Sequence, residues 1–302
     1  DLAFNRRGVM RDGKVCMPWF YANQQYPLGP THIRHIEGPV DPEVGVLCVR
    51  DASMRMIAML LHFTSHPVNL YATKYYAVSA DWPGAWSAEM QARFGADCVP
   101  LVLNGCCGNI NPWPAFVPDF KPDHRRMGRA LAETTDRIIG QMKFAEARGV
   151  DWAPRIVPLK LKSADPVRLA VAKKILAKHP APLWPKDRPG TIDPKWFQAA
   201  SIMSVECARR RGPRLNYEIQ AMRVGDVGFV GLPGEPFVEG QLAIKIGSPA
   251  PTTFVAHALS QYVGYIPTRE AFPHGGHEVD FSYWAKLAPE SLGGRVAEPI
   301  FV

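Results

Sequence analysis

The chain alternates between short apolar runs and longer segments with helical spacing. The apolar runs predict strands at residues 44–50, 56–63, 98–103, 156–161, 217–223, 227–230 and 253–258. Helical spacing predicts helices at residues 82–94, 123–147, 166–178, 194–210 and 236–246. Asp81 is a candidate N-cap for the first helix, and Pro83 lies near its first turn, where a missing N–H costs nothing. Alternating strands and helices favour an α/β class.

The connections between strands indicate their directions. Residues 51–53 form a plausible hairpin turn between the first two strands, and such turns join antiparallel neighbours. We therefore expect a single α/β domain over residues 1–302, with a mixed β-sheet core flanked by helices. Residues 180–194 are rich in proline and predict a connector, insertion or lid. Residues 1–40 show weak periodicity, which indicates a loop or the tail of an earlier unit.

Composition and charge exclude several classes of protein. The 302 residues are 47% hydrophobic and 21% charged, which excludes a disordered, collagenous or coiled-coil chain. No uninterrupted apolar run of about 18 residues is present, so we predict no transmembrane segment. The 35 basic against 28 acidic residues give a net charge of +7, but they are mostly scattered. We therefore predict no nucleic-acid partner and leave open an anionic substrate or peripheral contact with an acidic membrane surface.

Common sequence signatures give little support to other functions. No Gly-rich phosphate loop, GxSxG elbow or HExxH motif is present. Six cysteines in a chain of this length do not indicate a disulfide scaffold. Cys106 and Cys107 are adjacent, which disfavours a bridge between them, and no CxxC spacing for a structural zinc occurs. Cys48, Cys98 and Cys207 have apolar neighbours, so we expect them to be buried and to behave as small hydrophobic residues.

Polar, metal-capable residues occur at three predicted strand ends. His66 follows the second strand, where alternation places it on one face with His62 and Thr64; a hydrogen-bonded structural histidine is the alternative. Glu235 lies between two prolines before a short helix, where it is either a metal ligand or base, or a helix cap. Tyr265 follows a later strand and is either a ligand or a packing residue. Together these side chains supply N, O and O ligands of a kind suited to zinc.

An ordered set of short motifs resembles the neutral/alkaline non-lysosomal ceramidase family, particularly bacterial ceramidase-like members. The matching stretches are Asn5-Arg6-Arg7, Asp41 to Val46, His66-Pro67-Val68, Ser79-Ala80-Asp81, Gly108 to Pro112, Leu232 to Glu235 and Tyr262 to Thr268. They follow the family's order along the chain. The resemblance implies a ceramidase-like catalytic domain and an extracellular or cell-envelope location.

The resemblance also implies a site. In the family a zinc ion is held by two histidines, a glutamate and a tyrosine, and it activates attack on an amide. Carried over by motif, the metal ligands are His66, which resembles the family's second histidine, Glu235, and a tyrosine of the 262–265 motif, for which Tyr265 is favoured over Tyr262. We assign Asp81 to orienting a ligand, because metal-bound imidazoles usually donate their other N–H to a carboxylate or carbonyl.

The neighbouring motifs imply the remaining contacts. Asn111 and the 105–108 loop are expected to position the substrate carbonyl. Gly108, Asn109 and Tyr262 are expected to bind substrate.

Two departures from the family pattern matter. The family's first histidine lies in a His-Thr-His-type motif upstream of the Asn-Arg-Arg segment, and this sequence has none, so we expect an N-terminally incomplete domain with a weakened metal site. His32 or His35 is a less favoured replacement. Asn111 stands where the family has a serine, and an amide cannot act as a nucleophile in place of a hydroxyl.

Two functions follow from these observations. The first is zinc-dependent hydrolysis of an amide bond, with zinc-activated water as nucleophile and an N-acyl lipid or related small molecule as substrate. The second is a catalytically inactive ceramidase-like protein that binds a lipid or glycan. Residues 274–277, with two histidines around two glycines, are interpreted as a mobile lid rather than a metal site.

Overall fold

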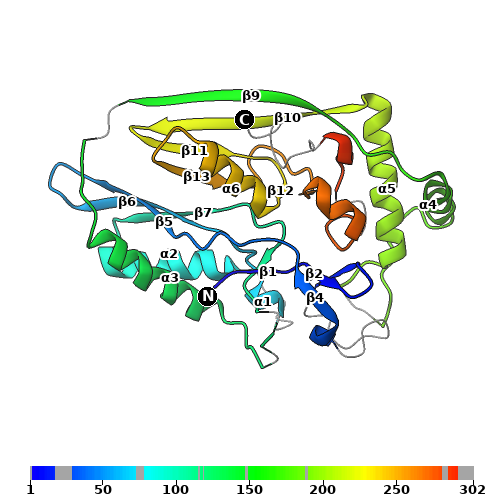
Figure 1. The fold of residues 1–302 in the computed structure, drawn as a ribbon, viewed down its shortest axis with the longest axis horizontal. Coiled ribbons are helices and arrows are strands. Elements are labelled where there is room, and N and C mark those ends of the chain that lie inside the picture. The colour runs from blue at the N-terminus through cyan, green and yellow to red at the C-terminus, as the bar shows by residue number, and fades with distance from the viewer. Residues whose placement is uncertain are drawn as a thin grey trace.

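The computed structural model describes residues 2–17, 29–72, 78–114, 116–117, 119–146, 149–187, 190–280 and 285–291. Two neighbouring sheets form its centre (Figure 1). The first has the order β5 (Gly45–Arg50), β6 (Met56–Phe63) and β7 (Val99–Asn104). The second has the order β13 (Thr252–Ala256), β11 (Val227–Gly231), β10 (Arg214–Val224) and β9 (Val150–Lys160).

Strand directions confirm the predicted mixed β structure. β5 and β6 form the expected antiparallel hairpin, whereas β6 and β7 are parallel. In the second sheet β9, β10 and β11 are antiparallel neighbours, and β11 is parallel to β13. Parallel neighbours require a crossover, and helices α2 (Asp81–Phe94) and α6 (Val238–Gly247) lie in these two connections.

The two sheets meet along β7 and β13. The His257 backbone N–H, just after β13, donates to the carbonyl of Asn104 at the end of β7 (3.2 Å). Nearby, His62 Nε2 donates to the Val255 carbonyl (2.9 Å). These contacts bring the carboxyl ends of β6, β7 and β13 together, and such ends are where α/β folds place ligand sites.

Each of the two sheets packs on its own apolar core. Helices α2 and α3 (His124–Ile139) pack on the β5–β6–β7 sheet, where Trp82 and Trp86 are fully buried. A second cluster lies under the other sheet and includes Tyr217, Leu232 and Val255.

Helices α4 (Pro166–Lys178) and α5 (Pro194–Arg211) form a small core of their own at one end of the molecule (Figure 1). Each begins with an aspartate cap followed by proline: Asp165 accepts from Arg168 N–H and Asp193 from Trp196 N–H. The Pro-rich connector joins these two helices, and residues 188 and 189 within it lie outside the described residues.

Several sequence predictions need correction. The first 40 residues contain short strands rather than only loop: β1 (Phe4–Asn5), β2 (Gly8–Met10), β3 (Val15–Cys16) and β4 (Ile33–Ile36). These strands are too short to show periodicity, and β1 pairs with the distant β8 (Ile110–Asn111). The helix predicted to reach residue 147 ends at Ile139, before Gly140. Cys207 is exposed, not buried.

Short elements complete the fold. They are α1 (Asn69–Ala72), β12 (Glu235–Pro236), β14 (Tyr265–Ile266) and the 3-10 helices Gly29–His32, Arg269–His274 and Pro289–Ser291. Within the described ranges, no helix has both the length and the apolar character needed to cross a bilayer.

Candidate functional site

His66 is fixed by the loop that follows β7. Its backbone N–H donates to the Ile110 carbonyl (3.0 Å), and its Nδ1 donates to the same oxygen (2.9 Å). A carbonyl only accepts, so the Nδ1 contact fixes the ring orientation and leaves Nε2 to face other groups. The side chain is 9% exposed. The side chains of His62 and Thr64 have other partners than His66. Thr64 accepts a hydrogen bond from Gln241 on α6, and His62 contacts Val255 on β13.

Glu235 is positioned by a short parallel strand pair. β12 pairs with β14 so that Glu235 lies opposite Tyr265, and Glu235 N–H donates to the Gly264 carbonyl (2.9 Å). Helix α6 begins only at Val238, with Phe237 at its N-cap. Glu235 therefore does not cap this helix, which removes the structural alternative considered for it.

Gly234 permits this strand pair, and its replacement by alanine is expected to destabilise the protein. Its φ is +71°, and an added Cβ would lie 2.5 Å from the Gly264 carbonyl oxygen. We expect Gly234→Ala to lower the free energy of unfolding by about 1–3 kcal/mol in urea denaturation. Gly247→Ala is the matched control, because nothing lies within 4 Å of a Cβ there. Equal stability of the two variants would contradict the prediction.

His66 and Glu235 form the centre of the site. His66 Nε2 lies 2.9 Å from Glu235 Oε2, and the Tyr262 hydroxyl donates to Glu235 Oε1 (2.6 Å). Burial alone would raise the pKa of Glu235, but His66 and Tyr262 outweigh it and lower the pKa to about 2. Burial would lower the pKa of His66, but the Cys107 sulfur and Glu235 raise it to about 9. The pair is therefore ionic at neutral pH.

Tyr265 lies beside this pair in a ring cluster. Its ring centroid is 6.3 Å from that of His66 and 5.6 Å from that of His277, and the Arg6 guanidinium lies 5.4 Å from it. Tyr265 is 5% exposed, whereas Tyr262 is 62% exposed. The three predicted metal ligands thus occupy one place, with Tyr262 at its solvent side.

The 105–111 loop packs tightly against the Glu235 strand. Gly108 N–H donates to the Pro236 carbonyl (2.9 Å), and a Cβ on Gly108 would lie 2.5 Å from the Glu235 carbonyl oxygen. The Asn109 amide binds Glu239 and the Val238 N–H of α6. These groups of Gly108 and Asn109 are occupied in holding the loop, so any contact with substrate would come from other atoms.

Asn111 is held by Arg6. Arg6 Nη1 donates to Asn111 Oδ1 (3.2 Å), and Arg6 Nη2 donates to the Gly108 carbonyl (2.7 Å). The Asn111 side chain is 3% exposed. Because its oxygen faces Arg6, its amide N–H groups point away from the guanidinium.

The structure corrects the role assigned to Asp81. Its carboxylate accepts from Asn69 Nδ2, Leu70 N–H and Trp82 N–H. The second nitrogen of His66 is held by the Ile110 carbonyl instead, so Asp81 does not orient the imidazole directly. Asp81 is also the first residue of α2 rather than its N-cap, with a φ of +49°. Its link to the site is indirect, through Trp82, whose indole donates to the His66 carbonyl (3.3 Å).

A buried ionic network behind the site was not predicted. Glu278 has no exposed surface and accepts from Arg6 Nε (2.7 Å) and Arg7 Nη1 (2.6 Å). Burial would raise the pKa of Glu278, but the two guanidinium groups lower it to about 2. Arg7 and His274 both pair with Glu37. Residues 274–278 are therefore anchored to the core by ion pairs, unlike the mobile lid expected from their glycines.

Cys107 is a second feature that sequence reasoning missed. Its sulfur lies 3.9 Å from both ring nitrogens of His257 and 3.6 Å from Asn104 Nδ2. Burial would raise the pKa of this thiol, but His257 and His66 lower it to about 5. Nothing in the local sequence indicated the contact, because His257 is 150 positions away.

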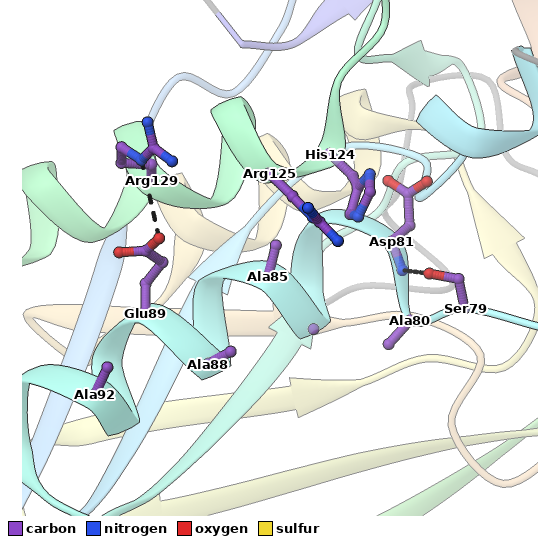
Figure 2. Close-up of a pocket in the computed structure, with 11 residues that line it drawn as sticks. Ser79, Ala80, Asp81, Ala85, Ala88, Glu89, Ala92, His124, Arg125 and Arg129 are labelled. Carbon is purple, nitrogen blue, oxygen red and sulfur yellow. Dashed lines mark hydrogen bonds and ion pairs between the residues drawn. The ribbon is translucent and has the colours of Figure 1, made fainter.

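A surface groove of about 500 Å³ lies between α2 and α3 (Figure 2). Small side chains of α2, including Ala85 and Ala88, face His124 and Arg125 of α3 across it. Asp81 lines its end, but His66, Glu235 and Tyr265 do not. The groove is therefore separate from the predicted metal ligands.

The donor set at His66 fits zinc in its chemistry. Imidazole nitrogen, carboxylate oxygen and phenol oxygen are all zinc ligands. His66 Nδ1 donates to the Ile110 carbonyl, which is how histidines that bind a metal through Nε2 are usually held. Within the described part of the chain, no three or more His, Cys, Asp and Glu side chains gather as a preformed metal site. His66 and Glu235 contact each other directly, and Tyr265 provides the third group.

Comparison with known proteins places this geometry in a structural context. No family model and no curated protein matches the chain. Among solved structures, the neutral ceramidase of Pseudomonas aeruginosa matches with a TM-score of 0.56 and 18% identity, over 83% of this chain and 44% of that one. The chain has a ceramidase-like fold. A ceramidase complexed with C2 matches with a TM-score of 0.57 and 17% identity, over 83% and 46% of the two chains.

The ceramidase-like fold confirms the resemblance and the α/β class expected from the sequence. The chain spans less than half the length of either ceramidase. At this identity the likeness concerns the fold, and residue roles must be argued from the site itself.

Proposed function

We propose that the protein is a ceramidase-like, zinc-dependent hydrolase of an amide bond in an N-acyl lipid or a related small molecule. The observation that supports this most strongly is the His66–Glu235 pair, with Tyr265 beside it, on a ceramidase-like fold. His66 follows the carboxyl end of β6 and Glu235 follows the carboxyl end of β11, and such strand ends are where α/β folds place ligand sites.

The metal would be held by His66, Glu235 and Tyr265. A bound zinc ion supplies a water molecule that is acidic enough to be a nucleophile near neutral pH. The chain's own contribution is to fix these ligands. The Ile110 carbonyl orients His66, the β12–β14 pairing places Glu235 opposite Tyr265, and Tyr262 holds the second carboxylate oxygen.

Asn111 and Arg6 would position the amide that is cleaved. Arg6 binds Asn111 Oδ1, which turns the amide N–H groups of Asn111 away from the guanidinium. An N–H donor can stabilise the negative charge that develops on a carbonyl oxygen during amide cleavage. Asn111 is not a nucleophile in this scheme, because water provides the attacking oxygen.

Asn111→Asp tests this assignment. Aspartate keeps an acceptor for Arg6 but loses both N–H donors, so we expect kcat to fall by about 100-fold. Kinetics on a ceramide with a short N-acyl chain measures the effect. Asn109→Asp is the comparison for a purely structural effect. It removes the amide donor to Glu239 of α6, so it is expected to lower thermal stability. An unchanged kcat in Asn111→Asp, with reduced thermal stability only, would show that Asn111 is structural.

The function itself is tested by metal content and turnover together. Because only three ligands are assigned to the site, zinc binding is expected to be weak, so elemental analysis of the 302-residue chain is made with zinc in excess. It is expected to give up to about one zinc per chain, and ceramide hydrolysis is expected to stop on chelation and return with added zinc. A chain that binds no zinc and cleaves no N-acyl substrate would overturn the proposal.

A second function is suggested by Asn111. The family's serine position lacks a hydroxyl here, which favours a protein that binds a lipid or glycan without cleaving it. Binding of a non-cleaved lipid that persists after zinc removal distinguishes this alternative. Both proposals are compatible with a secreted or cell-envelope location and peripheral contact with a membrane surface, which cell fractionation would test.

A further inference from the structure

The net positive charge of the chain is concentrated in the connection between β9 and β10. This connection, residues 161–213, contains helices α4 and α5. It holds 11 of the 35 basic residues but only 4 of the 28 acidic ones, a balance of +7. The other 249 of the 302 residues hold 24 basic and 24 acidic residues and are neutral in sum. The charges that look scattered along the sequence are therefore unevenly distributed in the fold.

Helix α4 is apolar on two opposite faces, and α5 covers one of them. The inner face packs on α5 through Leu169, Ala172 and Leu176. Because successive helical residues are about 100° apart, Val167 and Val171 lie on the opposite face, where they are 71% and 50% exposed. In Figure 1 α4 lies at the outer edge of the molecule, beyond α5. The two valines therefore face solvent.

Lysines continue the outer face of α4. Lys174 and Lys178 follow Val167 by seven and eleven positions, which places them on the same face, and Lys173 lies at its edge. All three lysines are exposed. The helix contains no acidic residue in its own sequence. Its outer face is thus aliphatic toward the N-terminus and cationic toward the C-terminus.

A tryptophan adds exposed apolar surface to the same unit. Trp184 follows α4 by six positions and is 59% exposed. The backbone beside it is fixed, because the Asp193 N–H donates to the Leu183 carbonyl (2.8 Å). Tryptophan is enriched where one side of a ring meets lipid and the other meets water. Valine, tryptophan and lysine together are the side chains of a helix that lies on a bilayer surface.

We propose that the outer face of α4 docks the protein on a bilayer that contains anionic phospholipid. The lysine ammonium groups meet the phosphates of the headgroups, and the exposed valines enter the headgroup layer. The phosphates of a nucleic acid would satisfy the lysines but would cover no valine, so a lipid surface fits both kinds of side chain. This docking is independent of amide hydrolysis, because it uses none of the residues assigned to the metal or the substrate.

Sedimentation with sucrose-loaded vesicles tests the docking. Vesicles of phosphatidylcholine alone are compared with vesicles of phosphatidylcholine and phosphatidylglycerol in a two-to-one ratio. Neither contains ceramide, and no zinc is added. We expect the 302-residue chain to bind the mixed vesicles and not the neutral ones, with binding that weakens as salt is raised.

A triple variant of α4 assigns the binding to its lysines. It carries Lys173→Gln, Lys174→Gln and Lys178→Gln. Because each basic side chain at an anionic surface strengthens binding about fivefold, we expect binding to weaken by about 100-fold. The matched control removes the same charge from exposed lysines elsewhere, at Lys14, Lys121 and Lys143. The control is expected to bind almost as tightly as the original chain.

A valine variant separates apolar docking from charge attraction. Val167→Ser with Val171→Ser keeps every charge, and we expect it to bind the mixed vesicles about tenfold more weakly. Thermal melting followed by circular dichroism should be the same in all variants, since the substituted side chains are exposed. Equal losses in the α4 lysine variant and its control, or an unchanged affinity in the valine variant, would overturn the proposal. Binding to a DNA duplex without binding to the mixed vesicles would also overturn it, in favour of a nucleic-acid surface.

Discussion

Replacing His66 by alanine is expected to remove bound zinc and amide hydrolysis together. In the proposed zinc site His66 would contribute the nitrogen ligand, and its Nε2 lies 2.9 Å from Glu235 Oε2. Mutating a residue that hydrogen-bonds a metal ligand typically lowers metal affinity or activity by about 10- to 100-fold. Removing a ligand itself should therefore reduce kcat/KM by more than about 100-fold. The measurements are zinc per chain by elemental analysis and ceramide hydrolysis by the same preparation.

Two controls make this result interpretable. His124→Ala changes a histidine that lines the separate groove between α2 and α3, so zinc and turnover should stay unchanged. His66→Gln keeps a polar side chain and tests whether alanine acts only by opening a cavity. Zinc and turnover retained in His66→Ala would exclude this residue from the site.

Zinc affinity is expected to rise steeply with pH between about 6.5 and 9. The pKa of His66 is raised to about 9, so at pH 7 its imidazole carries a proton that a zinc ion at the proposed site would have to displace. Each unit of pH below this pKa should weaken binding about tenfold. Glu235, with its pKa lowered to about 2, stays ionised over the whole range and adds no slope.

Competition with a chromogenic chelator at several pH values measures this slope. Release of about one proton on zinc binding at pH 7, found by calorimetry in buffers of different ionisation enthalpy, is the independent check. The raised pKa of His66 also makes the free energy of unfolding depend on pH. The contribution of His66 to folding is complete below pH 6.5 and is lost as the pH rises through about 9. A zinc affinity that does not change with pH would contradict the assignment of His66.

The sequence predicted the elements best where apolar runs were long. The β6 strand at 56–63 and helix α4 at 166–178 have the predicted bounds, because burial dictates a regular pattern within each. The pairs β1–β8 and β12–β14 were missed because each has only two residues per strand and depends on partners 30 to about 100 positions away. Such pairs leave no periodic trace in either segment.

Some residues of the candidate site could likewise be predicted from the sequence, and others could not. His66, Glu235 and Tyr265 could be found because each follows a predicted strand within a recognisable motif. The partner of His66 Nδ1 could not, because a backbone carbonyl has no sequence signature and Asp81 was the nearest carboxylate in the motifs. Glu278 and His257 became visible only through their contacts with Arg6 and Cys107, which are remote in sequence.

The link between Arg6 and Glu278 also sets when the site can form during synthesis. Arg6 holds Asn111 and Gly108, and Glu278 compensates its charge from 272 positions further along the chain. On a ribosome, Arg6, His66 and Asn111 are made long before Glu235, Tyr265 and Glu278. The two sheets can begin to form while the site still lacks half of its groups, so any metal held at the proposed site should bind only at the end of folding.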